Sequence, residues 1–313
     1  MPEFLHKRAD FKDLLALVAT NEGITPTLVE KDYWIMHCLW GLKQQGFVFE
    51  LKGGTSLSKG FGIIKRFSED IDIRFEPPAH LDVKIGKNHD KEIHIESRRN
   101  FYDWLTAEIN IPNISAVRAT EYDDARLRNG VIRLNYETRT EELKGVKPGI
   151  LLEVGFDDTA PNISTDITSW AFEKAKASGV DIIDNRAIGI LCYNPEYTFV
   201  EKLQTISTKF RQFRASGKMP SNFLRHYYDI YSLLDVDAVK AFIGTDEYEQ
   251  RKKQRFPAAD ELCIARNSAF LFDEIEEYKE FEKEYKSTAA LYYAGQPSLA
   301  SISSRIQEHI ENL

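Results

Sequence analysis

FELKGGTSLSKGFGIIKRFSEDIDIRF, residues 49–75, is the most informative stretch of the chain. An apolar run ends at the glycine pair Gly53 and Gly54, and further on Asp70 and Asp72 alternate with isoleucines. Strand side chains switch faces at every residue. We therefore expect both carboxylates to project from one face of a strand, with the isoleucines packed behind them.

Two parallel carboxylates suit a hard divalent cation, Mg²⁺ or Mn²⁺, that leaves its other positions to phosphate and water. The glycine pair lets backbone N–H groups approach a phosphate closely. A helix that we expect to start at Thr55 points its positive end at the same place. The pattern predicts a triphosphate site beside a metal site, and the alternative is a plain strand–helix–strand connection that ends in a solvated strand.

Gly-Gly-Thr and Asp-x-Asp, separated by residues 56–69, are each weak signals but are much stronger together. The pair resembles the signature of the polymerase-β-like nucleotidyltransferases. The fuller wording, KGGTSLSK with RFSEDIDI, is similar to the AbiEii/AbiGii toxin family within that superfamily. The resemblance covers residues 47–75 and 195–235, with a weaker echo at 28–42. It implies a toxin held in check by a separately encoded antitoxin.

A two-metal site for nucleotidyl transfer usually needs a third carboxylate near the attacking hydroxyl. Glu153 is the best candidate, because it interrupts the apolar segment ILLEVGF at 150–156. A charged residue in an apolar strand costs stability unless it is paired or bound to metal. The alternatives are that Glu153 points outward or pairs with an arginine, and that Asp157 is the third ligand.

The triphosphate is expected to lie on Gly53, Gly54 and Thr55. Lys59 follows Thr55 by one helical turn, so its ammonium could reach the β- or γ-phosphate. Ser68 precedes Asp70 by two residues and shares its face if the strand already runs there.

Two further positions follow from the resemblance alone. It implies a nucleotide-site lysine in EYTFVEKLQTI, which is Lys202, and an aspartate in LRHYYDIYSLL, which is Asp229. The alternative for Asp229 is an i,i+4 ion pair with Arg225. Lys31 and Asp32 match a family-like EKDYW run, for which we favour packing and capping over catalysis.

The composition describes a globular protein: 313 residues, 42% hydrophobic, with a net charge of −8. No apolar stretch approaches the ~20 residues that span a bilayer, and the N-terminus is charged where a signal peptide is apolar. The three cysteines are far apart, so we expect neither a disulfide framework nor a cysteine zinc site. A cytoplasmic location without a membrane partner is expected.

Residues 202–228 contain six Lys or Arg and no Asp or Glu, which could place a basic face on an acidic protein. We expect an RNA acceptor to contact this segment through its phosphates. The alternative is one helix with a solvated basic side. The predicted RNA-binding residues are Lys209, Arg211, Arg214 and Lys218.

The predicted fold class is α+β: a polymerase-β-like nucleotidyltransferase domain with a mixed, mostly antiparallel sheet flanked by helices, followed by a helical domain. The domains are expected at 1–194 and 195–313. Apolar periodicity predicts the following elements. Strands are expected at 114–121, 130–137 and 149–156, and helices at 9–20, 27–42, 87–109, 195–214, 221–235, 258–286 and 298–311.

These observations predict a metal-dependent nucleotidyltransferase that transfers a nucleoside monophosphate from an NTP to an RNA 3′ end, with tRNA implied by the resemblance. Two alternatives remain open. One is transfer of AMP to a protein hydroxyl, which suits the overall acidity. The other is a nucleotide-binding module without catalysis.

Overall fold

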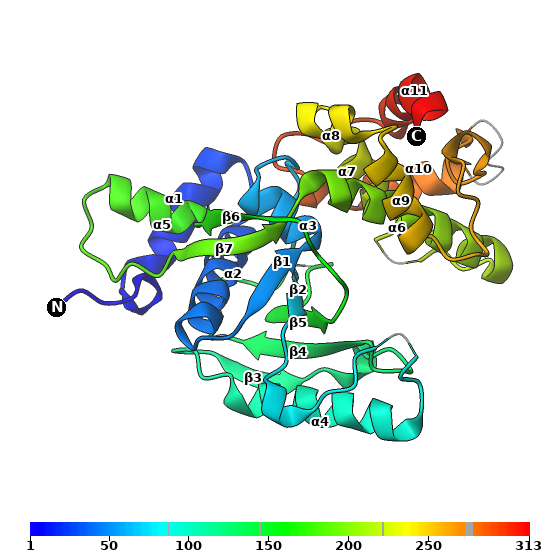
Figure 1. The fold of residues 1–313 in the computed structure, drawn as a ribbon. Coiled ribbons are helices and arrows are strands. Elements are labelled where there is room, and N and C mark those ends of the chain that lie inside the picture. The colour runs from blue at the N-terminus through cyan, green and yellow to red at the C-terminus, as the bar shows by residue number, and fades with distance from the viewer. Residues whose placement is uncertain (87, 144, 221, 273–277) are drawn as a thin grey trace. The chain divides into compact units, whose positions relative to one another are not determined.

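The computed structural model describes residues 1–86, 88–143, 145–220, 222–272 and 278–313 (Figure 1). The chain divides into two compact units. The first comprises Met1–Phe61 and Phe67–Tyr193, and the second comprises Gly62–Arg66 and Asn194–Leu313. The inclusion of Gly62–Arg66 in the second unit has no counterpart in the sequence pattern. Whether residues 1–194 and 195–313 fold as separate domains stays a prediction.

The first unit is built on one mixed sheet, in which the described residues form seven strands in the order β3-β4-β5-β2-β1-β7-β6 (Figure 1). The pairs β2–β5 and β1–β7 are parallel and the other four are antiparallel. The predicted mixed, mostly antiparallel sheet is therefore confirmed. The strands are β1 Phe49–Lys52, β2 Ile71–Phe75, β3 Ser115–Arg118, β4 Asn129–Asn135, β5 Ile150–Gly155, β6 Asn162–Ile167 and β7 Ala187–Tyr193.

The centre of the sheet follows directly from residue alternation. Ile71 and Ile73 of β2 are fully buried, and their register partners on β5, Leu152 and Val154, are fully buried as well. The hydroxyl of Tyr102, on the helix Glu92–Glu108, donates a hydrogen bond to the carbonyl of Val154 at 3.2 Å. The opposite face at this point carries the acidic residues.

Helices pack against the sheet near each of its two edges. Helix α4 lies along β3 and β4 (Figure 1). The helix predicted over 27–42 begins at Pro26, and the side chain of Thr25, the residue before it, makes no capping hydrogen bond. The helix expected at 87–109 starts only at Glu92. Residue 87 lies outside the described residues. The helices are α1 Phe11–Glu22, α2 Pro26–Gln44, α3 Gly53–Thr55, α4 Glu92–Glu108 and α5 Trp170–Ala177.

The second unit is helical in its described residues. The helix predicted over 258–286 is wrong for its first part, where 264–266 is only a 3₁₀ turn. Asn267 competes with helix formation there, because its amide donates to the carbonyl of Glu261 and its oxygen accepts from the N–H of Ala269. Residues 221 and 273–277 of two predicted helices lie outside the described residues. The helices are α6 Pro195–Ser216, α7 Arg225–Leu233, α8 Asp237–Phe242, α9 Asp246–Arg255, α10 Tyr278–Ser287 and α11 Leu299–His309.

No helix in the described part of the chain is long and apolar enough to cross a bilayer. Cys38, Cys192 and Cys263 are all free thiols.

Candidate active site

Three carboxylates lie on or next to the neighbouring strands β2 and β5. Asp72 of β2 is the register partner of Glu153 on the parallel strand β5. Asp70 lies directly before β2, two residues from Asp72, and its side chain is 13% exposed whereas that of Asp72 is 33% exposed. The side chains of parallel register partners lie on the same face of a sheet. The geometry therefore gathers the residues predicted as metal ligands, and Asp157 lies exposed beyond the end of β5.

The pKa of Glu153 reflects its burial and its two acidic neighbours. Burial, and then the charges of Asp72 and Asp70, raise the pKa of Glu153 to about 7, while Lys147 and Lys52 act in the opposite direction. Burial alone penalises a charged carboxylate, and two like charges add to that penalty. A bound cation would relieve both effects.

This pKa predicts how stability depends on pH when no metal is bound. Glu153 keeps its proton up to about pH 7 in the folded chain but only to about 4.5 when unfolded. The folded state binds the extra proton between these values, so the free energy of unfolding falls as the pH rises through the window, by about 3 kcal/mol at most.

The comparison with Glu153→Gln isolates this contribution. Urea unfolding in EDTA, followed by tryptophan fluorescence, reports the first unit because Trp34, Trp40, Trp104 and Trp170 all lie in it. The variant should gain stability relative to the wild type at pH 7.5 but not at pH 4.5. An equal difference at both pH values would show that Glu153 has an ordinary pKa.

Lysines bind two of the three carboxylates. Lys147 Nζ lies 2.9 Å from Asp70 Oδ2, and Lys52 Nζ lies 3.4 Å from Asp72 Oδ1. With these pairings, no three His, Cys, Asp or Glu side chains among the described residues converge on a metal position. The donor set nevertheless fits a hard cation, since Asp70 Oδ1 is buried and accepts no hydrogen bond from any described residue. Asp70, Asp72 and Glu153 could therefore hold a divalent metal.

Gly53 has to be glycine for two reasons. Its φ of +71° lies in the left-handed region, and a Cβ atom there would stand 2.9 Å from Asp72 Oδ2. The helical turn starts at this residue, as α3, and continues as a π-helical segment, Ser56–Gly60. The predicted start at Thr55 is therefore wrong by two residues, because the left-handed glycine turns the chain earlier.

Replacing Gly53 with alanine tests this close approach. The added methyl group must displace the Asp72 carboxylate, so we expect transfer activity to fall by about 10²-fold, as for a misplacement of about 1 Å at a reacting centre. The free energy of unfolding should fall by only about 1–2 kcal/mol, the cost of a left-handed alanine. Initial rates and urea unfolding measure the two effects. Gly23→Ala is the matched control, since Gly23 has a φ of +68° and open space around it.

Thr55 ties the glycine turn to the acidic loop. Its side chain is 1% exposed, and its hydroxyl donates a hydrogen bond to the backbone carbonyl of Asp70. The hydroxyl predicted to contact phosphate thus fixes the position of a carboxylate in this structure. Ser68 lies before the start of β2, so the condition that the strand already runs there is not met.

Lys59 does not extend from the turn toward solvent. Its Nζ lies 2.5 Å from Oδ1 of the fully buried Asp32, and 4.9 Å from the ring centroid of Trp170. Asp32 also accepts a hydrogen bond from the backbone N–H of Trp170 at 2.9 Å. A phosphate contact by Lys59 stays a prediction, and the packing role favoured for Asp32 agrees with its burial.

Helix α2 positions Lys147, a role that was not predicted from the sequence. Lys31 is 1% exposed; its ammonium donates to the carbonyl of Lys147 at 2.6 Å and lies 3.4 Å from Glu69 Oε2. Glu69 also accepts a hydrogen bond from the backbone N–H of Lys147 at 3.0 Å. The helix thereby positions the lysine that contacts Asp70. The only signal in the sequence was the charge of residues 30–32 within an apolar helix.

The second unit contains a buried ion cluster around Asp229. Arg66 donates to its two carboxylate oxygens through Nε and Nη2, both at 2.7 Å, and Lys202 Nζ lies 2.9 Å from Oδ2. Asp229 and Lys202, the two positions given by the family resemblance, are therefore in contact. Asp229 pairs with Arg66 and Lys202, whereas the alternative interpretation was an i,i+4 pair with Arg225.

More cations surround this cluster. His226 Nδ1 lies 3.5 Å from Lys202 Nζ, and its Nε2 lies 3.3 Å from Lys209 Nζ. Burial, and then Lys202, Lys209, Arg225 and Arg66, lower the pKa of His226 well below its ordinary value. A neutral imidazole amid four cations is an environment that favours an anion.

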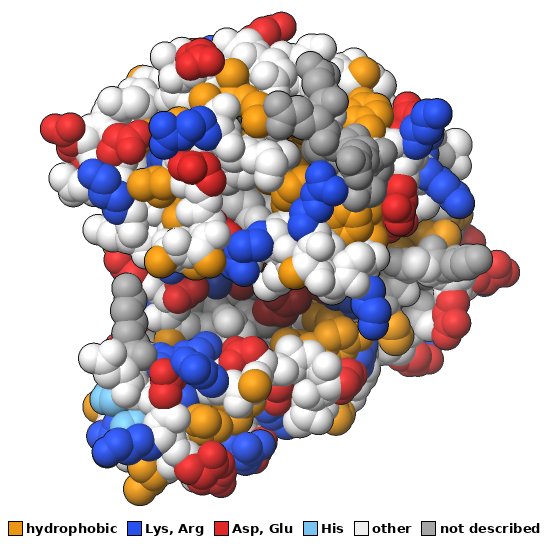
Figure 2. Space-filling view, turned by 90° about the vertical axis from the view of Figure 1, so that its right-hand side faces the viewer, with side chains coloured by type: hydrophobic (Ala, Val, Ile, Leu, Met, Phe, Trp, Pro, Cys, Tyr) orange, Lys and Arg blue, Asp and Glu red, His pale blue; other side chains and the backbone are white. Residues whose placement is uncertain are grey.

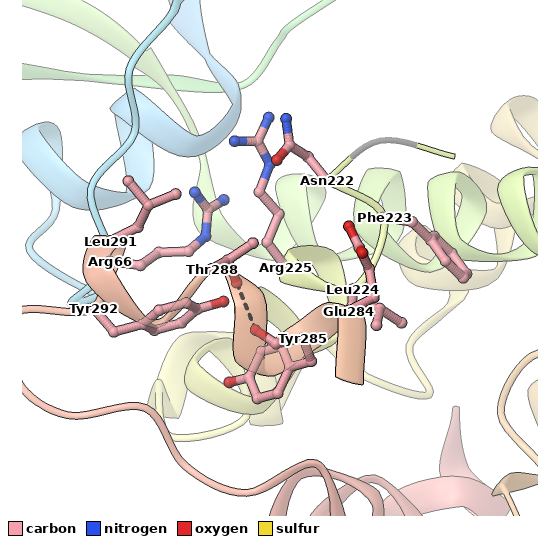
Figure 3. A pocket seen from close by; sticks show the side chains of 10 residues that line it. All are labelled: Arg66, Asn222, Phe223, Leu224, Arg225, Glu284, Tyr285, Thr288, Leu291 and Tyr292. Atoms are coloured by element: carbon pink, nitrogen blue, oxygen red, sulfur yellow. Dashed lines mark hydrogen bonds between the residues drawn. The ribbon is translucent and has the colours of Figure 1, made fainter. Parts of the chain in front are cut away.

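A small pocket opens beside these residues, and Figure 3 shows the guanidinium groups of Arg66 and Arg225 on the same side of it. The hydroxyl groups of Tyr285 and Tyr292, which also line it, are buried. The dashed contact in Figure 3 is the bond from the Thr288 hydroxyl to the carbonyl of Tyr285, 2.7 Å long.

The predicted RNA-binding residues lie on and after α6, where acidic residues from elsewhere approach them. Arg211 Nε pairs with Asp260 Oδ1 at 2.5 Å, and the guanidinium of Arg214 lies 5.4 Å from the ring centroid of Phe210. Lys209 faces His226, and Lys218 follows the helix end at Ser216. Residues 202–228 contain no Asp or Glu, but folding brings Asp260 into contact with this segment. On the face in Figure 2, cationic and anionic side chains are interspersed.

The sheet, with a glycine turn on one strand end and carboxylates on adjoining strands, defines a polymerase-β-like nucleotidyltransferase fold. A family model described as nucleotidyl transferase AbiEii toxin of type IV toxin–antitoxin systems matches residues 41–307. The chain belongs to this family. Enzymes of this kind use a nucleoside triphosphate and a divalent metal, and the family implies an antitoxin.

Two of the solved structures that match the chain are proteins of this kind by their descriptions. The nucleotidyltransferase toxin MenT4 from Mycobacterium tuberculosis is 15% identical, covers 95% of this chain and 88% of its own, and has a TM-score of 0.49. An antigenic nucleotidyltransferase-like protein from Paracoccidioides brasiliensis is 12% identical, covers 87% and 96%, and has a TM-score of 0.34. A comparison with curated protein sequences gives no match.

Proposed function

We propose that this protein is a metal-dependent nucleotidyltransferase that transfers a nucleoside monophosphate from an NTP to the 3′ end of an RNA, with tRNA as the acceptor. The observation that carries the proposal is the register pairing of Asp72 with Glu153 directly beside Gly53. It supports the proposal because carboxylates of the kind that bind a metal lie beside a backbone turn that suits phosphate.

Asp70, Asp72 and Glu153 would hold Mg²⁺ or Mn²⁺. Such ions, when bound, neutralise charge on the α-phosphate and on the departing pyrophosphate. Glu153 takes the proton of the attacking 3′-hydroxyl. The 3′-oxygen forms a bond to the α-phosphorus, the bond between that phosphorus and the bridging oxygen breaks, and pyrophosphate leaves with both electrons.

The backbone N–H groups of Gly53 and Gly54 bind the triphosphate. Lys202 is proposed to contribute to nucleotide binding, as the family resemblance implies, and the cations around it favour an anion. Asp229 holds Lys202 and Arg66 in position rather than contacting the nucleotide itself, since both cations are bound to its carboxylate.

The RNA is proposed to lie along α6, where Lys209, Arg214 and Lys218 contact phosphates and so give affinity without base specificity. Arg211, paired with Asp260, contributes less than the others. A separately encoded antitoxin is proposed as a partner, as the family implies.

Incubation of the protein with cell extract and α-labelled NTPs, with and without Mg²⁺, tests the acceptor. Label should enter RNA and require Mg²⁺. Label confined to a protein band would overturn the RNA assignment in favour of AMP transfer to protein.

Arg214→Glu should raise the KM for RNA by about tenfold and leave the KM for NTP unchanged. Lys240→Glu, 45% exposed on α8, is the control.

A further inference from the structure

A pocket of about 560 Å³ lies in the first unit, beside the acidic residues but outside the residues assigned so far. Its volume is in the range of small-molecule sites. The loop between β4 and β5 forms one wall and α2 forms the other. The side chains that matter here are Lys31, Asn135, Tyr136, Glu142, Val146 and Lys147.

The pocket adjoins the reacting centre through Lys147. This lysine lines the pocket, and its ammonium lies 2.9 Å from Asp70 Oδ2. Lys31, which lines the pocket too, fixes the backbone of Lys147 through a hydrogen bond of 2.6 Å. A ligand in the pocket therefore lies next to the proposed metal ligands.

Helix α2 holds the loop in place, so the pocket is built before any ligand arrives. Thr27 donates to the carbonyl of Glu141 at 2.8 Å. The fully buried Glu30 accepts hydrogen bonds from the Thr138 hydroxyl at 2.8 Å and from the backbone N–H of Arg139 at 2.7 Å. On the inner side, Tyr136 stacks on Trp34 with a centroid separation of 4.8 Å.

The strand order separates this pocket from the triphosphate turn. The sheet runs β4-β5-β2-β1, and Gly53 follows β1, whereas the pocket lies on the connection from β4 to β5. The two sites thus flank β2 on opposite sides. Glu153, the carboxylate proposed to face the attacking hydroxyl, is on β5 and so on the side of the pocket.

The lining disfavours a triphosphate, because Lys31 and Lys147 are already paired with Glu69 and Asp70, and Glu141 and Glu142 add negative charge. Carboxylate oxygens accept hydrogen bonds from ribose hydroxyls, and the amide of Asn135 both donates and accepts, as a base edge requires. Resting on the proposed function, we propose that this pocket binds the terminal ribonucleoside of the RNA acceptor and presents its 3′-hydroxyl to the reacting centre.

Val146→Trp fills the pocket and tests the proposal. Fluorescence anisotropy with 5′-labelled tRNA should show at least about tenfold weaker binding, the scale of losing one held base. The affinity for α-labelled NTP, measured by equilibrium dialysis, should stay within about twofold, which also shows that the variant is folded. Val117→Trp, at a valine of β3 that is 53% exposed, is the matched control. Asn135→Ala is a milder second variant with the same expected direction.

The chemistry of the RNA end gives a second readout. Wild-type protein should bind tRNA with a 3′-hydroxyl about tenfold more tightly than tRNA with a 3′-phosphate, and Val146→Trp should remove the difference. Loss of NTP binding in both variants, or unchanged RNA binding in both, would overturn this inference without contradicting the proposed function of the wild type. Absence of transfer to RNA by the wild type would contradict the proposed function and this inference together.

Discussion

Replacing Asp72 with asparagine is expected to lower nucleotidyl transfer by about 10³-fold or more, and Asp70→Asn should do the same. Stabilisation of phosphate charge by metal contributes several kcal/mol to such a reaction, and each 1.36 kcal/mol is a factor of ten. The substitution keeps the shape of the side chain but removes the charge that binds the cation. Initial rates with saturating NTP, together with isothermal titration of Mg²⁺, measure both consequences.

The control for this prediction is Asp82→Asn, since the side chain of Asp82 is 80% exposed and pairs only at the surface with Lys84. Its rate should stay within twofold of the wild type. If Asp70→Asn and Asp72→Asn retain full activity, the carboxylates are not the metal ligands of the reaction. Absence of transfer by the wild type itself would instead favour the non-catalytic nucleotide-binding alternative.

Asp229→Asn is expected to cause the largest loss of stability, about 3–5 kcal/mol, within the second unit. Arg66 and Lys202 are 2% and 7% exposed, so removal of the carboxylate leaves two buried cations without their counter-charge. Asparagine has nearly the same volume, so loss of packing cannot account for the effect.

Hydrogen exchange resolves this effect by unit. Amides of α6 and α7 should exchange faster in Asp229→Asn, and those of β2 and β5 should be unchanged. Asp235→Asn is the matched control, because its side chain is 65% exposed and pairs with Arg305 at the surface. Protection of α7 equal to that of the wild type would show that the ion cluster adds little to stability.

The sequence predicted the parts of the site that depend on local pattern. Asp70 and Asp72 could be placed because strand alternation is a local rule, and Glu153 stood out as the one charge in an apolar strand. The strands β6 and β7 and the helix α5 were missed; β6, at the edge of the sheet, is mostly polar and presents no apolar alternation.

Contacts between distant residues could not be predicted. Arg66 and Asp229 are 163 positions apart, and Lys31 and Lys147 are 116 apart, so no periodicity links them. Lys147 lies in a loop without a recognisable motif, although it contacts Asp70. The basic segment after residue 202 looked uniform in sequence, yet folding brings Asp260 to Arg211.

Comparison of α-labelled with γ-labelled NTP, using tRNA as acceptor, tests the central claim most directly. We expect the α-label to enter the RNA 3′ end and the γ-label to be released as pyrophosphate. Asp70→Asn or Asp72→Asn should abolish both. Entry of the γ-label into the acceptor, or α-label incorporation that survives both substitutions, would contradict the central claim.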